Sequence, residues 1–241
     1  AKNMSLVGHM PFPANLNDIW AYEAPDGTEY ALVGRTDGVS IVDLSEPANP
    51  VQRQFIPGPN STWRDLKTHS HYAYVSNETA NGILIIDLST LPAAASFKDT
   101  VIAGVSTIHN LWTADSFLYA SGIGSGYTGG IMMLDLRNDP WRPQLAGIYD
   151  TRYVHDVYTR GDLAYAAEIN DGLLTILDIS DKSAAVELGS RNYINSFTHN
   201  TWLNDAGDVC FTTDELNGAY VYAWDVSDPS DIRQLDRIRS S

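Results

Sequence analysis

A two-residue polar pair recurs five times along the chain, at intervals of 44 to 47 residues. The first members of the pairs are Asn17, Arg64, His109, His155 and His199. An aspartate that closes a short apolar run recurs at a similar interval, at Asp43, Asp87, Asp135, Asp178 and Asp225. A period in the forties with several short strands per repeat is typical of a β-propeller blade. The sequence therefore predicts an all-β propeller of repeated four-stranded blades, with five repeats visible.

Each repeat contains four expected strands in the same order. The first follows the polar pair, the second follows a tight turn, the third ends at the aspartate, and the fourth has the weakest pattern. A glycine precedes the third strand in every repeat, where a positive φ would allow a tight connection: Gly38, Gly82, Gly130, Gly172 and Gly218. We interpret the closing aspartates as structural, because an aspartate can accept hydrogen bonds from the backbone of the turn that follows it.

We expect a single propeller domain over residues 1–241. Its repeats span approximately residues 13–58, 59–104, 105–150, 151–194 and 195–241. Residues 4–12 resemble a further fourth strand, although the last repeat already has its own. This extra outer strand indicates either that the chain is a portion of a larger ring of about seven blades, or that five blades close with the strand outside.

The chain resembles the LVIVD-repeat β-propellers called choice-of-anchor B family proteins. The resemblance is carried by NDIWAYEAPDGTEYALVGRTDGVSIVDLSEPANPV and by WRDLK, HNLW, VHDVY, LTILDISDKS, THNTWL, TDEL and WDVSDPS. Members of that family are typically exported by bacteria and held at the surface by varied C-terminal anchors. The resemblance implies an extracellular or cell-surface location, with the periplasm as the alternative, and a binding or scaffolding role with a protein or glycan partner.

Charge and hydropathy restrict the classes of partner. The formal net charge of −15 argues against binding to nucleic acid or to an anionic membrane. No apolar run is long enough to span a membrane, and the first residues contain no apolar signal segment. We therefore expect the signal of an exported protein to have been removed or to lie outside this chain. The single cysteine, Cys210, excludes an internal disulfide and is expected to be buried.

The polar pairs define the expected functional site. In a propeller the first strand lines the central channel, and the antiparallel second strand ends beside the start of the first. Side chains at both positions should therefore gather at the channel mouth: Asp18, Asp65, Glu78, His109, His155, Asp156, Glu168, His199, Asp214 and Glu215. Asn110 and Asn200 belong to the same constellation.

Three interpretations of this constellation remain open. The pairs could form hydrogen bonds between neighbouring blades, with each histidine donating to the next blade. Carboxylates and amide oxygens would suit Ca²⁺, which we expect in preference to a transition metal. Imidazoles at His109, His155 and His199, with Glu168 or Glu215, would instead suit a metal-dependent hydrolase, lyase or oxidoreductase. No nucleotide-binding motif is present.

Two further features accompany the polar pairs. The aromatic residues Trp20, Trp112, Tyr158 and Trp202 recur two residues after the second member of each pair, and we expect them to pack between blades. The glycine-rich segment 121–130 joins two strands and opens no helix, so we expect a rim loop, with Tyr127 available to a ligand or partner, and not a phosphate cradle.

Overall fold

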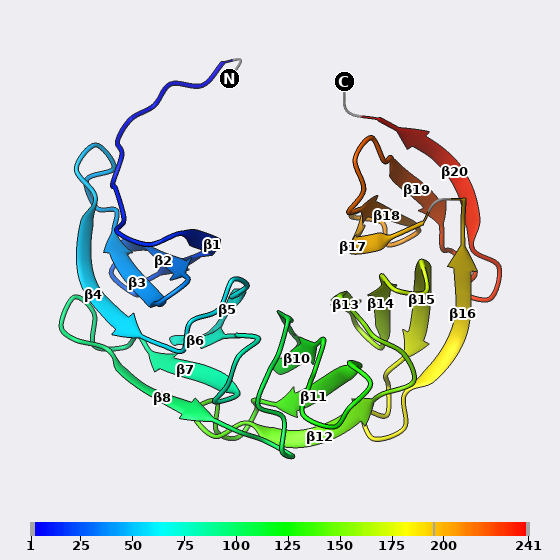
Figure 1. Ribbon diagram of the computed structural model, residues 1–241, viewed down its shortest axis with the longest axis horizontal. Coiled ribbons are helices and arrows are strands. Elements are labelled where there is room, and N and C mark those ends of the chain that lie inside the picture. The colour runs from blue at the N-terminus through cyan, green and yellow to red at the C-terminus, as the bar shows by residue number, and fades with distance from the viewer. Residues whose placement is uncertain (1–2, 195, 240–241) are drawn as a thin grey trace. The chain divides into compact units, whose positions relative to one another are not determined.

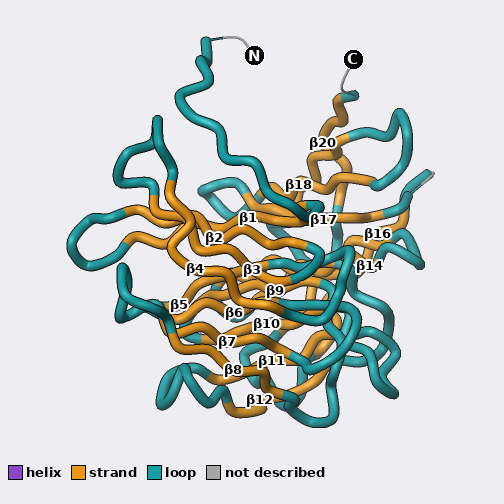
Figure 2. The backbone as a smooth tube through the Cα atoms, turned by 60° about the vertical axis from the view of Figure 1, so that its left-hand side comes forward, coloured by secondary structure: helices purple, strands orange, loops and turns teal. Residues whose placement is uncertain are grey.

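The computed structural model describes residues 3–194 and 196–239, which form twenty β-strands and no helix (Figure 2). These strands make five four-stranded antiparallel sheets, each built from four strands consecutive in the chain (Figure 1). The prediction of an all-β chain of four-stranded repeats is confirmed. We call the sheets blades 1 to 5 in chain order. Within the described residues, nothing helical is available to cross a membrane.

The chain divides into two compact parts, and each is described by itself. The N-terminal part ends at Thr107 and holds two blades. Blade 1 consists of β1 (Leu16–Glu23), β2 (Glu29–Arg35), β3 (Gly38–Asp43) and β4 (Val51–Pro57). Blade 2 consists of β5 (Leu66–His69), β6 (Tyr72–Val75), β7 (Ile83–Asp87) and β8 (Ser96–Thr100).

The C-terminal part begins at Ile108 and holds three blades. Blade 3 consists of β9 (Asn110–Ala114), β10 (Phe117–Ser121), β11 (Ile131–Asp135) and β12 (Gln144–Tyr149). Blade 4 consists of β13 (Asp156–Arg160), β14 (Leu163–Glu168), β15 (Leu173–Asp178) and β16 (Val186–Asn192). Blade 5 consists of β17 (Thr198–Leu203), β18 (Val209–Asp214), β19 (Val221–Asp225) and β20 (Arg233–Ile238).

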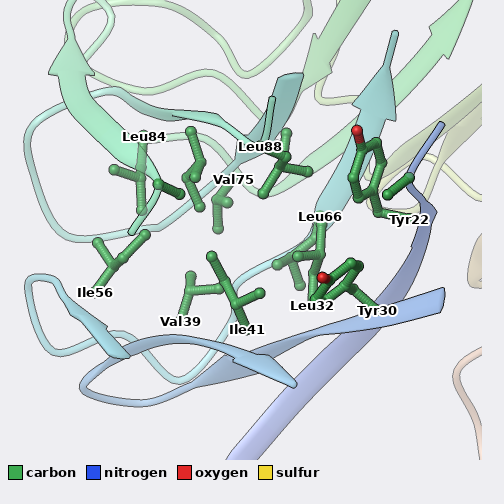
Figure 3. Packing of buried hydrophobic residues seen from close by; sticks show 14 residues of the cluster. Tyr22, Tyr30, Leu32, Val39, Ile41, Ile56, Leu66, Val75, Leu84 and Leu88 are labelled. Atoms are coloured by element: carbon green, nitrogen blue, oxygen red, sulfur yellow. The ribbon is translucent and has the colours of Figure 1, made fainter. Parts of the chain in front are cut away.

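Blades within each part pack face to face. Successive side chains of a strand point to opposite faces, so each blade presents one face to its predecessor and one to its successor. In the N-terminal part, Leu32 and Ile41 of blade 1 lie in one buried cluster with Leu66 and Val75 of blade 2 (Figure 3). We call the face toward the next blade in the chain the forward face and the opposite one the back face.

The C-terminal part repeats this packing twice. Tyr119 and Met133 of blade 3 are buried with residues of blade 4, and Tyr165 and Ile176 of blade 4 are buried with Trp224 and other residues of blade 5. The first strands β9, β13 and β17 are in contact as neighbours. This arrangement brings the starts of the three strands together, which is where the histidine pairs occur.

Residues 4–12, expected to form a strand, have no assigned strand. The segment nevertheless lies against blade 1, where Met10 and Phe12 pack on Ala31 and Val33 of the back face. A Cβ on Gly8 would lie 2.3 Å from the carbonyl oxygen of Pro47. The segment thus occupies the position of a fourth strand, but no described strand pairs with it in the manner needed for a ladder.

The turn chemistry of the repeats agrees with the prediction. All five closing aspartates accept a hydrogen bond from the backbone N–H two residues later, at 2.8 to 3.0 Å. Four of the five glycines before the third strands have positive φ. The exception is Gly130, because the neighbouring Gly129 takes the positive φ of 110°. Gly130 is required for space instead, since a Cβ there would lie 1.8 Å from the carbonyl oxygen of Tyr149.

Candidate metal centre

Three imidazoles form a row across the starts of β9, β13 and β17. The ring centroids of His109 and His155 are 4.1 Å apart, and those of His155 and His199 are 4.4 Å apart. The three residues come from three consecutive blades of the C-terminal part. The sequence prediction that these histidines gather is therefore confirmed for His109, His155 and His199.

Local backbone features place each ring in the row. His109 and His155 precede their strands, and their N–H groups donate to Ser121 and Ala167 of the adjoining second strands. His199 lies at a register shift between Thr198 and Asn200, which is a bulge in β17. A bulge redirects a side chain and is common beside functional sites.

The central imidazole, His155, has a defined tautomer. Its Nδ1 lies 3.0 Å from the main-chain carbonyl oxygen of His199. A carbonyl oxygen only accepts, so Nδ1 carries the proton and Nε2 keeps a free lone pair. Burial, together with the proximity of His109 and His199, lowers the pKa of His155 to about 3. His155 is consequently neutral at physiological pH.

One carboxylate completes the cluster. His155, His199 and Glu215 each offer a donor atom, and these atoms all lie within 4.8 Å of one another. His155 is buried, His199 is partly buried and Glu215 is exposed. Two imidazoles and one carboxylate are a donor set that borderline-soft divalent metals use.

The second members of the pairs form a separate link between blades. Asn200 donates through its side-chain amide to the carboxylate of Asp156, and the N–H of Val157 donates to the same carboxylate at 2.7 Å. Together with the bond from His155 to the carbonyl of His199, this link joins β13 to β17. The interpretation of the pairs as bonds between blades is therefore confirmed for blades 4 and 5.

Two predicted site carboxylates have other partners. Glu168 is fully buried, where it accepts from Tyr149, from Arg152 at 3.0 Å and from Thr175 at 2.8 Å. Burial raises the pKa of Glu168, and the listed partners oppose that shift. The carboxylate of Asp214 accepts from the Tyr193 hydroxyl at 2.6 Å. Both groups already have structural partners, which the end-of-strand pattern alone did not reveal.

The three predicted site residues of the N-terminal part are Asp18, Asp65 and Glu78. The Lys67 ammonium lies 2.7 Å from Asp65 and 4.4 Å from the centre of the Trp20 ring. Burial and a hydrogen bond with Asp18 raise the pKa of Asp65, against the lowering effect of Lys67. Asp18 and Asp65 are thus brought together, whereas the Glu78 side chain is exposed.

The remaining members of the first two pairs are structural. The Arg64 guanidinium is buried and donates to the carbonyl oxygens of Arg35 and Pro59. The Asn17 amide donates to the carbonyl oxygen of Ser61 at 3.3 Å. The repeated register of the sequence therefore contains different chemistry in the two parts of the chain.

Aromatic packing between blades is confirmed in the C-terminal part. The ring centroid of Tyr158 lies 5.0 Å from that of Trp112 and 4.7 Å from that of Trp202. In the predicted rim loop, Gly122 has a φ of 62°, and a Cβ there would lie 2.5 Å from the Cβ of His109. The loop backbone therefore covers His109, a role for which the glycine-rich composition was the signal.

Sheets of this order, repeated as blades, define a propeller-like repeat protein. Three segments match the family model described as the LVIVD repeat, at residues 17–53, 63–100 and 152–192. The chain therefore contains LVIVD repeats, a propeller-type repeat, and this much of the resemblance is confirmed. Comparison with curated protein sequences finds no match.

Several solved structures share the fold. A functionally unknown protein from Desulfotomaculum acetoxidans DSM 771 has a TM-score of 0.70 at 10% identity, covering 100% of this chain and 75% of that one. A proposed 6-phosphogluconolactonase from Bacteroides uniformis ATCC 8492 has a TM-score of 0.68 at 12% identity, covering 91% and 71%. A protein from Lactobacillus plantarum has a TM-score of 0.69 at 12% identity, covering 90% and 70%. At these identities the likeness concerns the fold alone.

Proposed function

We propose that this chain is a binding and scaffolding module that assembles with a second copy of itself through the uncovered faces of its terminal blades. The observation that supports the proposal most directly is the forward face of blade 5. Trp202 pairs with Phe211 across this face, and their side chains are 50% and 40% exposed.

The equivalent positions of the other blades are buried. Tyr165 of blade 4 and Tyr119 of blade 3 correspond to Phe211 in cross-strand register, and both are at most 3% exposed. They are buried because the following blade packs on them. The forward face of blade 5 continues the same series of interfaces, so another blade is the occupant that its shape and chemistry fit.

The back face of blade 1 supplies the complementary surface. Ile19 is 59% exposed, whereas Leu111 and Val157, its equivalents in blades 3 and 4, are each 1% exposed. A back face of this type is what a forward face contacts within each part of the chain. Two copies therefore offer both halves of a head-to-tail contact, which is a heterologous interface.

Sedimentation velocity on the tag-free chain over a wide concentration range tests this function. We expect the wild type to self-associate, and Phe211→Ser and Ile19→Ser each to shift the protein to the monomer. Leu188→Ser, which also removes a partly exposed leucine but from β16, is the matched control and should behave as wild type. A wild type that stays monomeric throughout, or a Phe211→Ser protein that still assembles, would overturn the proposal.

We further propose that the module belongs to a secreted or cell-surface protein, with the periplasm as the alternative. The choice-of-anchor B resemblance and the net charge of −15 support this location. Labelling of intact cells with an antibody against the chain tests it. Surface labelling is the expected result, and labelling only after both membranes are opened would contradict it.

A further inference from the structure

We infer that His155, His199 and Glu215 form a binding site for a transition-metal ion of the Zn²⁺ type, with a coordination position left for an exogenous ligand. This site belongs to the C-terminal part and is independent of the proposed assembly. It uses the starts of β13 and β17 and the residue that follows β18, whereas the assembly uses the outer faces of blades 1 and 5.

The donor atoms are close enough to converge on one ion. All three lie within 4.8 Å of one another. Two donors of a tetrahedral zinc ion, each roughly 2.0 to 2.1 Å from the metal, are separated by about 3.4 Å. The cluster therefore has to contract by about 1 Å, which the exposed Glu215 side chain can provide by a change of rotamer.

The tautomer of His155 is the one that a metal ligand requires. Because its Nδ1–H donates to the carbonyl oxygen of His199, the lone pair of Nε2 is the free one. Histidine ligands commonly donate their other N–H to a backbone carbonyl, which fixes the ring and raises its basicity. Here the acceptor is the carbonyl of the second proposed ligand, so one bond orients both residues.

The ligand-bearing backbone is also held in place. The Ser121 hydroxyl donates to the main-chain carbonyl of His155 at 3.2 Å in a buried position. The bridge from Asn200 to Asp156 ties the residues immediately after His155 and His199 to each other. Two links between adjacent blades therefore restrain the two imidazoles before any ion binds, which reduces the entropic cost of binding.

The chemistry of the donors favours a zinc-type ion over the calcium ion expected from the carboxylate count. Ca²⁺ prefers six to eight oxygen ligands, whereas this cluster has two imidazole nitrogens and one carboxylate. Three protein ligands leave room for water or a substrate at a fourth position, as in catalytic zinc sites. His109, stacked on His155 at 4.1 Å, borders the cluster but lies outside the group of three donors. A metal-dependent enzyme would require such an open position.

The test is zinc binding by the full, tag-free chain after removal of metals with a chelator. Isothermal titration with ZnCl₂, followed by dialysis and elemental analysis, should give one bound zinc per chain. We expect His199→Ala to weaken binding by at least about 100-fold and Glu215→Gln by about 10-fold. Excess CaCl₂ should not displace the zinc.

Controls separate the site from nonspecific binding and from unfolding. His9→Ala removes an exposed histidine outside the cluster and should bind zinc as the wild type does. His155→Ala alters a buried residue, so His199→Ala and Glu215→Gln carry the test, with near-UV circular dichroism as the check on folding. Loss of Co²⁺ visible absorption in His199→Ala would show directly that the imidazole is a ligand. Wild-type binding that is absent, or equal in all folded variants, would overturn the proposal.

Discussion

At the scale of single residues, the closing aspartates show how one side chain stabilises a turn. Asp43 is the most fully bonded of the five, since it accepts from the Ser45 N–H at 2.8 Å and from the Arg53 guanidinium at 2.7 and 2.9 Å. These bonds, with Ser45 contributing most, lower the pKa of Asp43 to about 2. Its carboxylate is therefore more favourable in the folded than in the unfolded chain.

We predict that Asp43→Asn lowers the free energy of unfolding by about 1–2 kcal/mol at pH 7. Because the folded pKa is depressed, this contribution is present above the unfolded value of about 3.9 and is lost as the pH falls through about 2. Urea unfolding of both proteins at pH 7 and near pH 2.5 measures it. Asp205→Asn is the exposed control. An equal difference at both pH values would contradict the prediction.

Glu168 is the residue whose role differs most from the prediction made from sequence. It pairs with Arg152, which also contacts the more exposed Glu187 at 2.9 Å. We predict that Glu168→Gln costs about 3 kcal/mol of unfolding free energy, because it breaks a buried ion pair and leaves its partners unsatisfied.

Glu187→Gln is the matched control, because it removes the other carboxylate from the same arginine. A pair at this partly exposed position should contribute less than about 1 kcal/mol. Thermal and urea unfolding of the two variants give the comparison. If the two substitutions had the same effect, burial would not be the reason for the stability of the Glu168 pair.

At the scale of elements, the outer strands approach the neighbouring blade closely through glycine. A Cβ on Gly147 of β12 would lie 1.7 Å from the carbonyl oxygen of Lys182, and one on Gly189 of β16 would lie 2.2 Å from that of Pro229. Gly8 makes the corresponding approach to Pro47. The recurring glycine therefore lets a fourth strand lie against the turn of the next blade.

We predict that Gly189→Ala destabilises the protein by roughly 1–3 kcal/mol, since the methyl group meets backbone that cannot move away without shifting a strand. Ser190→Ala, at the next and exposed position of β16, should change stability by less than about 0.5 kcal/mol. Differential scanning calorimetry measures both. An unchanged melting temperature for Gly189→Ala would show that the turn at Pro229 yields easily.

At the scale of the whole molecule, excess negative charge opposes the folded state. The chain has 30 acidic and 15 basic residues, so repulsion between carboxylates outweighs the ion pairs of the turns. We predict that raising NaCl from about 10 to 150 mM stabilises the protein by on the order of 1 kcal/mol, because the Debye length falls from roughly 30 to 8 Å.

Thermal unfolding at constant pH with increasing NaCl measures this effect. Sucrose at matched osmolality serves as the uncharged control, because it acts by exclusion from the protein surface and not by screening. A melting temperature that falls with NaCl would mean that the ion pairs contribute more than the net repulsion.

Sequence alone determined the class of the fold, because its evidence is local and repeated. Alternating strand residues, turn aspartates and glycines act within a few residues of one another, and five copies of the pattern reinforce the prediction. The prediction for residues 4–12 was wrong as a strand, yet Gly8 correctly indicated a close approach to the next turn. A strand needs a hydrogen-bonded partner, which no local pattern reports.

Only the tertiary structure decided which polar residues act together. The sequence placed ten candidate side chains at strand ends, but burial gave Glu168 to Arg152 and a local contact gave Asp214 to Tyr193. It also showed that a bulge at His199 and its main-chain carbonyl set the tautomer of His155. Such partners are distant in the chain, and their distances depend on how neighbouring blades pack, so a repeat period can indicate where a site forms but not which atoms form it.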